Sequence, residues 1–178
     1  LIIKMDADGQ HDPNYLAELI PYLLKLNKNK LLMLKGSRYL WPELSKNTPI
    51  SRRIGSSLIE PMIRSSLNYR GLTDVANGFL AMNYLTLNFL MIPKFGTRLR
   101  KRYLFELSLL EKCSSMKVEI REFGMLARYN QNWKSSMQIH KMILPILFFC
   151  SRSIIRRIVI SYFLKINLGS LLLLISIS

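Results

Sequence analysis

Two carboxylates stand one residue apart near the beginning of the chain, directly after a short apolar run. The run is LIIKM, residues 1–5, and the carboxylates belong to Asp6 and Asp8. An apolar run of this kind is typical of a buried strand, and α/β proteins bind ligands at the carboxyl ends of their strands. Because Mg²⁺ takes one or two carboxylates and leaves its other positions to phosphate and water, this acidic doublet is a candidate site for a cation that binds a diphosphate.

A pair of acids can also be solvated turn residues without chemistry, or part of another motif. The haloacid-dehalogenase-like phosphatases use the first aspartate of a similar motif as a nucleophile and the second as an acid or base. Their mechanism needs a later acidic pair, and no DD or DxxxD cluster follows Asp12. An EF-hand loop needs glycine at its sixth position, where this chain has His11. Cation binding at the strand end is therefore the favoured interpretation.

The segment after the doublet predicts the elements that hold it in place. Asp12, followed by proline, has the character of a helix N-cap. Apolar residues at helical spacing then predict an amphipathic helix over 13–27, which Pro21 can bend. KLLMLKGSRY, residues 30–39, predicts a second strand that ends at its glycine. Strand, helix and strand in this order form the unit of a parallel α/β sheet.

The following segments carry weaker patterns. We expect, in chain order, a loop over 40–50, one bent helix or a helix pair over 50–69, a turn and short strand over 71–83, a helix over 103–116 and an edge strand over 117–129. Together these elements indicate an α/β domain.

The charge of the chain is strongly positive. Its 178 residues include 26 basic and 11 acidic ones, a net charge of +15, which favours an anionic partner. No acid follows Glu122, and basic residues alternate there with apolar ones. This pattern favours a helix lying on an anionic membrane surface over a nucleic-acid arm, for which no recognition motif is present. An ordinary basic surface helix remains an alternative.

The C-terminal part has a membrane-surface character. The stretches 136–149 and 152–165 have the pattern of interfacial helices, and the final run, 168–178, has 11 residues. At 1.5 Å per residue it reaches roughly 16 Å, against a bilayer core of ~30 Å. We interpret it as the start of a transmembrane helix, with a buried C-terminal helix as the alternative. Cys113 and Cys150 have no metal-ligand spacing, which favours a reducing compartment.

Five segments, in order along the chain, resemble motifs of the family 2 glycosyltransferases: MDADGQHDP, KGSRY, ISRRIGS, LTDVANGFLAM and KRYLFEL. The most similar branch is the polyprenyl-phosphate glycosyltransferases, which act on dolichol phosphate or undecaprenyl phosphate. The resemblance covers residues 1 to about 165. It implies a GT-A fold, an α/β sandwich that binds a nucleotide-sugar, followed by juxtamembrane helices.

The resemblance also implies a domain organisation. Residues 1–130 correspond to a partial GT-A catalytic domain, 131–165 to interfacial amphipathic helices, and 166–178 to the start of a truncated transmembrane helix. Family members carry a βαβ region before the acidic doublet, which holds the base and ribose of the donor. Since Leu1 already lies in the predicted strand, we expect a fragment that lacks this region and binds the donor poorly by itself.

The resemblance assigns roles around the two substrates. Asp6, Asp8 and Gln10 match residues that hold Mg²⁺ or Mn²⁺ on the donor diphosphate. Binding of the acceptor phosphate is implied for Arg38, for Arg52 or Arg53, and for Ser56. Arg102 and Tyr103 are implied to lie close to phosphate or sugar. Arginine suits phosphate because its planar fork donates two parallel hydrogen bonds, although a surface ion pair is the alternative for each arginine.

Two acids match catalytic positions of the family, Asp74 in LTDVANGF and Glu106 in KRYLFEL. A phosphate monoester has a second pKa of about 6, so the acceptor hardly needs a general base, and Asp74 is expected to orient a substrate or a basic partner. An Asx-turn cap is the alternative for Asp74, and the polar edge of an amphipathic helix is the alternative for Glu106.

The resemblance implies a metal-dependent hexosyltransferase on the cytoplasmic face of a membrane. It would transfer a sugar from a nucleotide-sugar to a membrane polyprenyl phosphate, with inversion at the anomeric carbon. Two alternatives remain open: a family 2 enzyme that acts on a polysaccharide or glycolipid, and a non-catalytic remnant that binds membrane surfaces.

Overall fold

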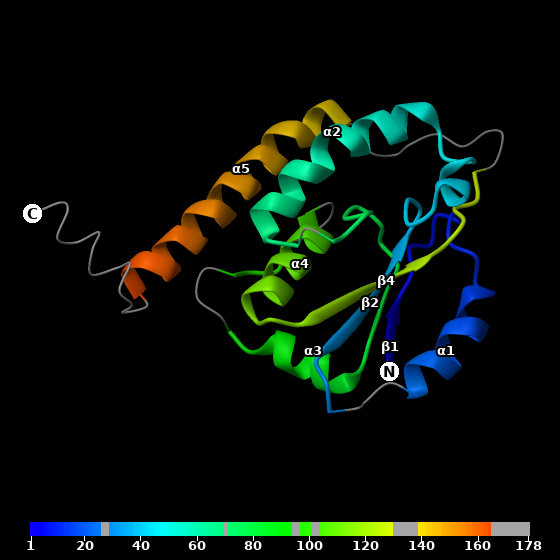
Figure 1. Ribbon diagram of the computed structural model, residues 1–178, viewed down its shortest axis with the longest axis horizontal. Helices are drawn as coiled ribbons and strands as arrows, with labels where there is room; N and C mark the ends of the chain where they lie inside the picture. The colour runs from blue at the N-terminus through cyan, green and yellow to red at the C-terminus, as the bar shows by residue number, and fades with distance from the viewer. Residues whose placement is uncertain (26–28, 70, 94–96, 101–103, 130–138, 165–178) are drawn as a thin grey trace, which may run out of the picture. The chain divides into compact units, whose positions relative to one another are not determined.

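The computed structural model describes residues 1–25, 29–69, 71–93, 97–100, 104–129 and 139–164 (Figure 1). The chain divides into two compact units, Leu1–Ser136 and Met137–Ser178. The sequence predicts a boundary after residue 130, and the division between the units falls between residues 136 and 137.

The first unit is a mixed α/β domain, as the sequence predicts at that level. Its elements, in chain order, are β1 (Ile2–Lys4), α1 (Tyr15–Lys25), β2 (Leu32–Ser37), the 3₁₀ turn η1 (Pro42–Ser45), α2 (Ile50–Leu67), β3 (Leu80–Met82), α3 (Tyr84–Met91), α4 (Phe105–Ser115) and β4 (Glu119–Gly124). The helix predicted over 103–116 and the edge strand predicted over 117–129 correspond to α4 and β4. The segment 50–69 forms one helix, α2, with Pro61 inside it.

The four strands form one sheet in the order β1-β3-β2-β4. β3 pairs antiparallel with both β1 and β2, and β2 pairs parallel with β4. The sequence predicts a strand–helix–strand unit of a parallel sheet, whereas the observed sheet is mixed. β1 and β2 do run in the same direction, but the three-residue strand β3 lies between them. Such a pairing over a long sequence separation is not specified by any local pattern.

One face of the sheet packs against α1, which lies alone on its side of the sheet in Figure 1. A buried apolar cluster fills this face: Leu19, Leu34, Phe79, Ala81 and Met125, with Ile3, Met5, Tyr15, Leu16 and Phe123 packed around it. Before the helix, Asn14 N donates to Asp12 Oδ1 at 3.0 Å. Asp12 therefore caps the segment that enters α1, as its sequence context predicts.

The other face of the sheet carries an unexpected row of charged side chains. Lys4 pairs with Leu80, Leu80 pairs with Lys35, and Lys35 pairs with Glu122 across the four strands. Residues opposite each other in a sheet point to the same face. We call Lys4, Lys35 and Glu122 the charged row. Lys35, in the middle of the sheet, is completely buried.

The second unit contains α5 (Ile139–Ile158), followed by a π-helical segment (Val159–Leu164). The two stretches predicted as interfacial helices, 136–149 and 152–165, are joined in one continuous helix over the described residues 139–158. Among the described residues of this unit, the exposed large apolar side chains are Ile143, Leu144, Leu147, Phe148, Ile154, Ile155, Ile158 and Tyr162. Within the described part of the chain, no helix has the length and apolar character needed to cross a membrane. The predicted transmembrane start, 166–178, lies outside the described residues.

Candidate functional site

The carboxylate of Asp6 lies in a small cluster at the end of β1. Lys4 Nζ donates to Asp6 Oδ1 at 2.8 Å, to Glu106 Oε1 at 2.8 Å and to Gly78 O at 3.2 Å. A Cβ on residue 78 would collide with the Asp6 carboxylate, so only glycine allows this approach. Burial opposes the charge of Lys4, but the hydrogen bonds to Asp6 and Glu106 raise its pKa above the ordinary value. The fold thus brings together two of the acids that the sequence singles out.

Asp8, the second acid of the doublet, contacts Gln10. Gln10 donates to the Asp8 carboxylate twice, from its backbone N at 3.1 Å and from Nε2 at 2.7 Å. Arg52 Nη1 donates to Gln10 Oε1 at 3.1 Å. The residue between the acids and the glutamine, Gly9, has φ +75°, a backbone conformation that favours glycine. Through this turn, the doublet contacts the N-terminal part of α2.

Asp74 forms a buried bidentate ion pair with Arg38. Arg38 Nε donates to Asp74 Oδ2 at 2.7 Å, and Nη2 donates to Oδ1 at 2.9 Å. The backbone N of Arg38 also donates to Oδ2, at 3.0 Å. Burial would raise the pKa of Asp74, but the Arg38 guanidinium lowers it below the ordinary value. Asp74 is therefore a carboxylate held by Arg38, an arrangement suited to orienting that arginine and poorly suited to accepting a proton.

Tyr129 connects the two arginines, and sequence reasoning missed it. Arg38 Nη1 donates to Tyr129 Oη at 3.3 Å, and the Arg52 guanidinium lies 6.0 Å from the centre of the Tyr129 ring. Contacts therefore run without a break from Asp8 through Gln10, Arg52, Tyr129 and Arg38 to Asp74. The only signal in the sequence was an aromatic residue at the end of the predicted edge strand.

The structure separates Arg52 from Arg53. Arg52 and Ser56 lie one turn apart on α2, and so share a helix face. Tyr39 Oη donates to Ser56 Oγ at 3.4 Å, which places this face beside the segment that carries Arg38. Arg53 is exposed, and we leave it out of the candidate site. Arg102 and Tyr103 lie outside the described residues.

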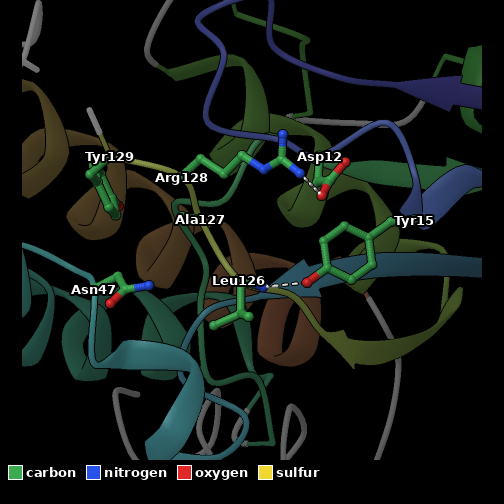
Figure 2. Close-up of a pocket in the computed structure, with 7 residues that line it drawn as sticks. All are labelled: Asp12, Tyr15, Asn47, Leu126, Ala127, Arg128 and Tyr129. Carbon is green, nitrogen blue, oxygen red and sulfur yellow. Dashed lines mark hydrogen bonds and ion pairs between the residues drawn. The ribbon is translucent and has the colours of Figure 1, made fainter.

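A cavity of about 540 Å³ adjoins the site (Figure 2). Its lining consists of Asp12, Tyr15, Asn47, Leu126, Ala127, Arg128 and Tyr129. Arg128 pairs with Asp12, and Leu126 N donates to Tyr15 Oη at 2.8 Å. None of the residues that the sequence predicts for the site lines this cavity. Tyr129 belongs to both, so the cavity is a neighbour of the arginines.

The acidic doublet offers ligands that suit a magnesium or manganese ion. Two carboxylates and an amide oxygen are a normal protein contribution to Mg²⁺, which keeps several waters. No group of three or more His, Cys, Asp or Glu residues with metal-site geometry occurs among the residues that the structure describes. Both carboxylates also accept hydrogen bonds, from Lys4 and from Gln10. A bound cation would share these oxygens with the donors or displace them.

Two further titratable residues near Asp74 are buried: Lys35, the first residue of KGSRY, and Glu60, which lies outside the five motifs. Burial lowers the pKa of Lys35 to about 8, although nearby Asp74 opposes this shift. Burial raises the pKa of Glu60, on α2, to about 8, and Asp74 adds to this shift. Glu60 Oε1 has no hydrogen-bond partner among the described atoms, and Oε2 lies 3.6 Å from Arg64 Nη2. Glu60 is therefore a buried acid with only a long ion pair, whose pKa favours the protonated form at neutral pH.

Comparisons with protein-family models, with curated proteins and with solved structures found no match to this chain. The resemblance to the family 2 glycosyltransferases therefore depends on the five sequence motifs.

Proposed function

We propose that this chain belongs to a membrane-surface glycosyltransferase with a GT-A-like domain, which transfers a sugar from a nucleotide-sugar to a polyprenyl phosphate. One observation supports it above the others. The acidic doublet, the arginines of KGSRY and ISRRIGS, and Asp74 come from separate motifs, yet one chain of contacts joins Asp8 to Asp74. Residues proposed for the donor diphosphate and for the acceptor phosphate are therefore neighbours.

The acceptor side of the reaction would use the arginines. Arg52 and Ser56 share a face of α2 and would donate hydrogen bonds to the phosphate, and Arg38 would add positive charge. Because Asp74 holds two nitrogens of Arg38, the guanidinium has a fixed orientation toward Tyr129. An acceptor phosphate that is already ionised attacks without a general base. Positioning and electrostatic stabilisation would then supply most of the catalysis.

The donor side would use the acidic doublet. Asp6, Asp8 and Gln10 would hold Mg²⁺ or Mn²⁺, which neutralises charge on the departing nucleoside diphosphate. Gly78 keeps the Asp6 carboxylate against the backbone of the loop that carries Asp74. Glu106 meets Asp6 through Lys4, so its proposed role is to fix the position of that lysine.

The second unit would hold the enzyme at the membrane. α5 exposes apolar side chains along its length and carries basic residues, among them Lys141, Arg152 and Arg157. This composition supports a helix that lies in the interface of an anionic membrane. A cytoplasmic domain held in this way would reach a phosphate at the membrane surface.

The test is transfer from nucleotide-sugars to polyprenyl phosphate, measured in membranes from cells that express the protein. We expect transfer that is abolished by EDTA, restored by Mg²⁺ or Mn²⁺, and lost in Asp8→Ala. Transfer that is insensitive to EDTA would contradict the metal role. Binding to anionic vesicles with no transfer from any nucleotide-sugar would instead favour a non-catalytic membrane-binding protein.

A further inference from the structure

The loop over residues 73–78 carries Asp74 and brings Gly78 to Asp6, yet it contains no helix or strand. We call it the Asp74 loop. The Asp74 and Asn77 side chains within it are buried. A loop without its own ladder of hydrogen bonds needs partners elsewhere for its buried backbone groups. These partners decide how firmly Asp74 is held in place.

Glu122, from the charged row, holds the beginning of the loop. Thr73 N donates to both carboxylate oxygens of Glu122, at 2.9 and 2.8 Å, and Thr73 Oγ1 donates at 2.8 Å. Asp74 N donates to Glu122 Oε1 at 3.1 Å. Hydrogen bonds to an ionised carboxylate are stronger than those between neutral groups. The backbone at Asp74 is therefore fixed directly by the edge strand β4.

The two lysines of the charged row hold the end of the same loop. Lys35 Nζ donates to Asn77 O, and Lys4 Nζ donates to Gly78 O at 3.2 Å. The acceptors are carbonyls of consecutive residues, while the donors come from β2 and β1, with β3 between them. Three charged side chains in one row of the sheet thus contact both ends of one short loop.

The position of Lys35 makes this arrangement costly for the fold. Its side chain is completely buried, and burying a cation lowers stability unless partners compensate. Its strand neighbours Met33 and Leu34 are apolar, so an apolar residue would fit the same strand pattern. Among the residues that the structure describes, Asn77 O is the one atom to which Lys35 Nζ donates a hydrogen bond. We take this contact as the purpose of the lysine.

We propose that Lys4, Lys35 and Glu122 are positioning residues, which clamp the Asp74 loop so that Asp74 meets Arg38 and Gly78 lies against Asp6. The clamp itself is independent of the enzyme's reaction. Its consequence for catalysis rests on the proposed function. In that case the charged row sets the geometry of the diphosphate and phosphate sites together, without contacting either substrate.

Hydrogen exchange followed by mass spectrometry tests the clamp without any substrate. In Lys35→Met, peptides covering residues 72–79 should exchange about tenfold faster or more, because a hydrogen bond from a charged group is lost. Peptides covering 105–115 should exchange as in the wild type. Leu80→Ala is the matched control, since Leu80 is buried in the same row but donates no side-chain hydrogen bond. We expect it to raise exchange in both regions together.

Unchanged exchange over 72–79 in Lys35→Met would overturn the proposal, as would a rise equal to that over 105–115. If Lys35→Met does not fold, Lys4→Met is the second variant, because Lys4 is part-exposed on the edge strand β1. It should loosen the same peptides. Faster exchange confined to residues 72–79 in both variants would support the clamp. If the wild-type protein at the same time shows no sugar transfer, the clamp stands and the proposed function is refuted.

Active protein adds a second readout. In Lys4→Met and Lys35→Met, a misplaced Asp74 loop should lower kcat about tenfold or more, because reacting groups lose alignment. KM for the nucleotide-sugar should change less than kcat. A change in KM alone, with kcat unchanged, would contradict a positioning role for the row.

Discussion

Two aspartates of the site, Asp6 and Asp74, each form an ion pair with a basic side chain, and the two pairs differ sharply in burial. The Lys4–Asp6 pair is exposed, with side-chain exposures of 33% and 44%, whereas the Arg38–Asp74 pair has 8% and 0%. An exposed pair contributes little to stability and can exchange partners at low cost. A buried pair is costly to break, because removing one partner leaves a buried charge. The comparison indicates that Asp6 can exchange Lys4 for another partner, whereas Asp74 stays bound to Arg38 and holds it in place.

The strongest test of this contrast is Asp74→Ala. It leaves the Arg38 guanidinium buried without its carboxylate, and should lower the free energy of unfolding by about 3–5 kcal/mol. Urea unfolding followed by circular dichroism measures this loss. Asp74→Asn keeps the shape and should cost somewhat less. A loss under about 1 kcal/mol in Asp74→Ala would put the buried pair in the same class as the exposed one.

Glu60 extends the comparison, because it is a buried acid that lacks a bidentate arginine partner of the kind that Arg38 provides for Asp74. Its pKa is raised from 4.5 to about 8, so the folded protein binds a proton that the unfolded chain releases. The free energy of unfolding should therefore fall as pH rises from 5 to 8, by about 3 kcal/mol from this residue. In Glu60→Gln this part of the pH dependence should vanish. Parallel stability curves for the two proteins would refute the raised pKa.

Gly78→Ala tests the contact between the Asp74 loop and the Asp6 carboxylate. The added Cβ would collide with the Asp6 carboxylate, and turning this exposed side chain away should cost about 1 kcal/mol and displace Asp6. Gly71→Ala is the control, since a Cβ there meets no atom within 4 Å; its cost should stay within about 0.5 kcal/mol. Thermal unfolding compares the two variants. Equal costs would show that Asp6 does not depend on Gly78.

The smallest stability effect is expected for Asp6→Asn. Because the Lys4–Asp6 pair is exposed, its loss should lower the free energy of unfolding by less than about 1 kcal/mol. The same change should weaken Mn²⁺ binding, measured by electron paramagnetic resonance, because one carboxylate ligand is lost. Unchanged Mn²⁺ binding, or a destabilisation as large as that of Asp74→Ala, would reverse the roles assigned to the two acids.

Local patterns in the sequence predicted α1, α2, α4 and the edge strand β4, whereas no helix was predicted where α3 (Tyr84–Met91) lies. α1, α4 and β4 follow from apolar periodicity and from cap residues such as Asp12, which act within a few residues. The place of β3 between β1 and β2 could not be predicted in this way. It depends on which strands pair over long separations, and three buried residues, LAM, carry no register signal.

The candidate site shows the same division. Motifs indicated Asp6, Asp8, Arg38 and Asp74, because these residue types recur in known chemistry. Lys35 and Glu122 were missed: Lys35 opens the KGSRY motif, in which only the arginine was assigned a role, and Glu122 lies in an alternating edge strand where a charged residue is ordinary. Their shared row exists only after register brings the strands together. Whether the motif residues act in glycosyl transfer stays a prediction.

We propose above all that the face of α2 formed by Arg52 and Ser56 binds an acceptor phosphate beside the acidic doublet. The most direct measurement compares Arg52→Ala with Arg53→Ala, two neighbours on one helix, by KM for polyprenyl phosphate in sugar transfer. Arg52→Ala should raise KM about tenfold or more, because a charge-assisted hydrogen bond is lost, while Arg53→Ala should leave it within about twofold. Equal effects of the two variants, or no effect of Arg52→Ala, would contradict the account.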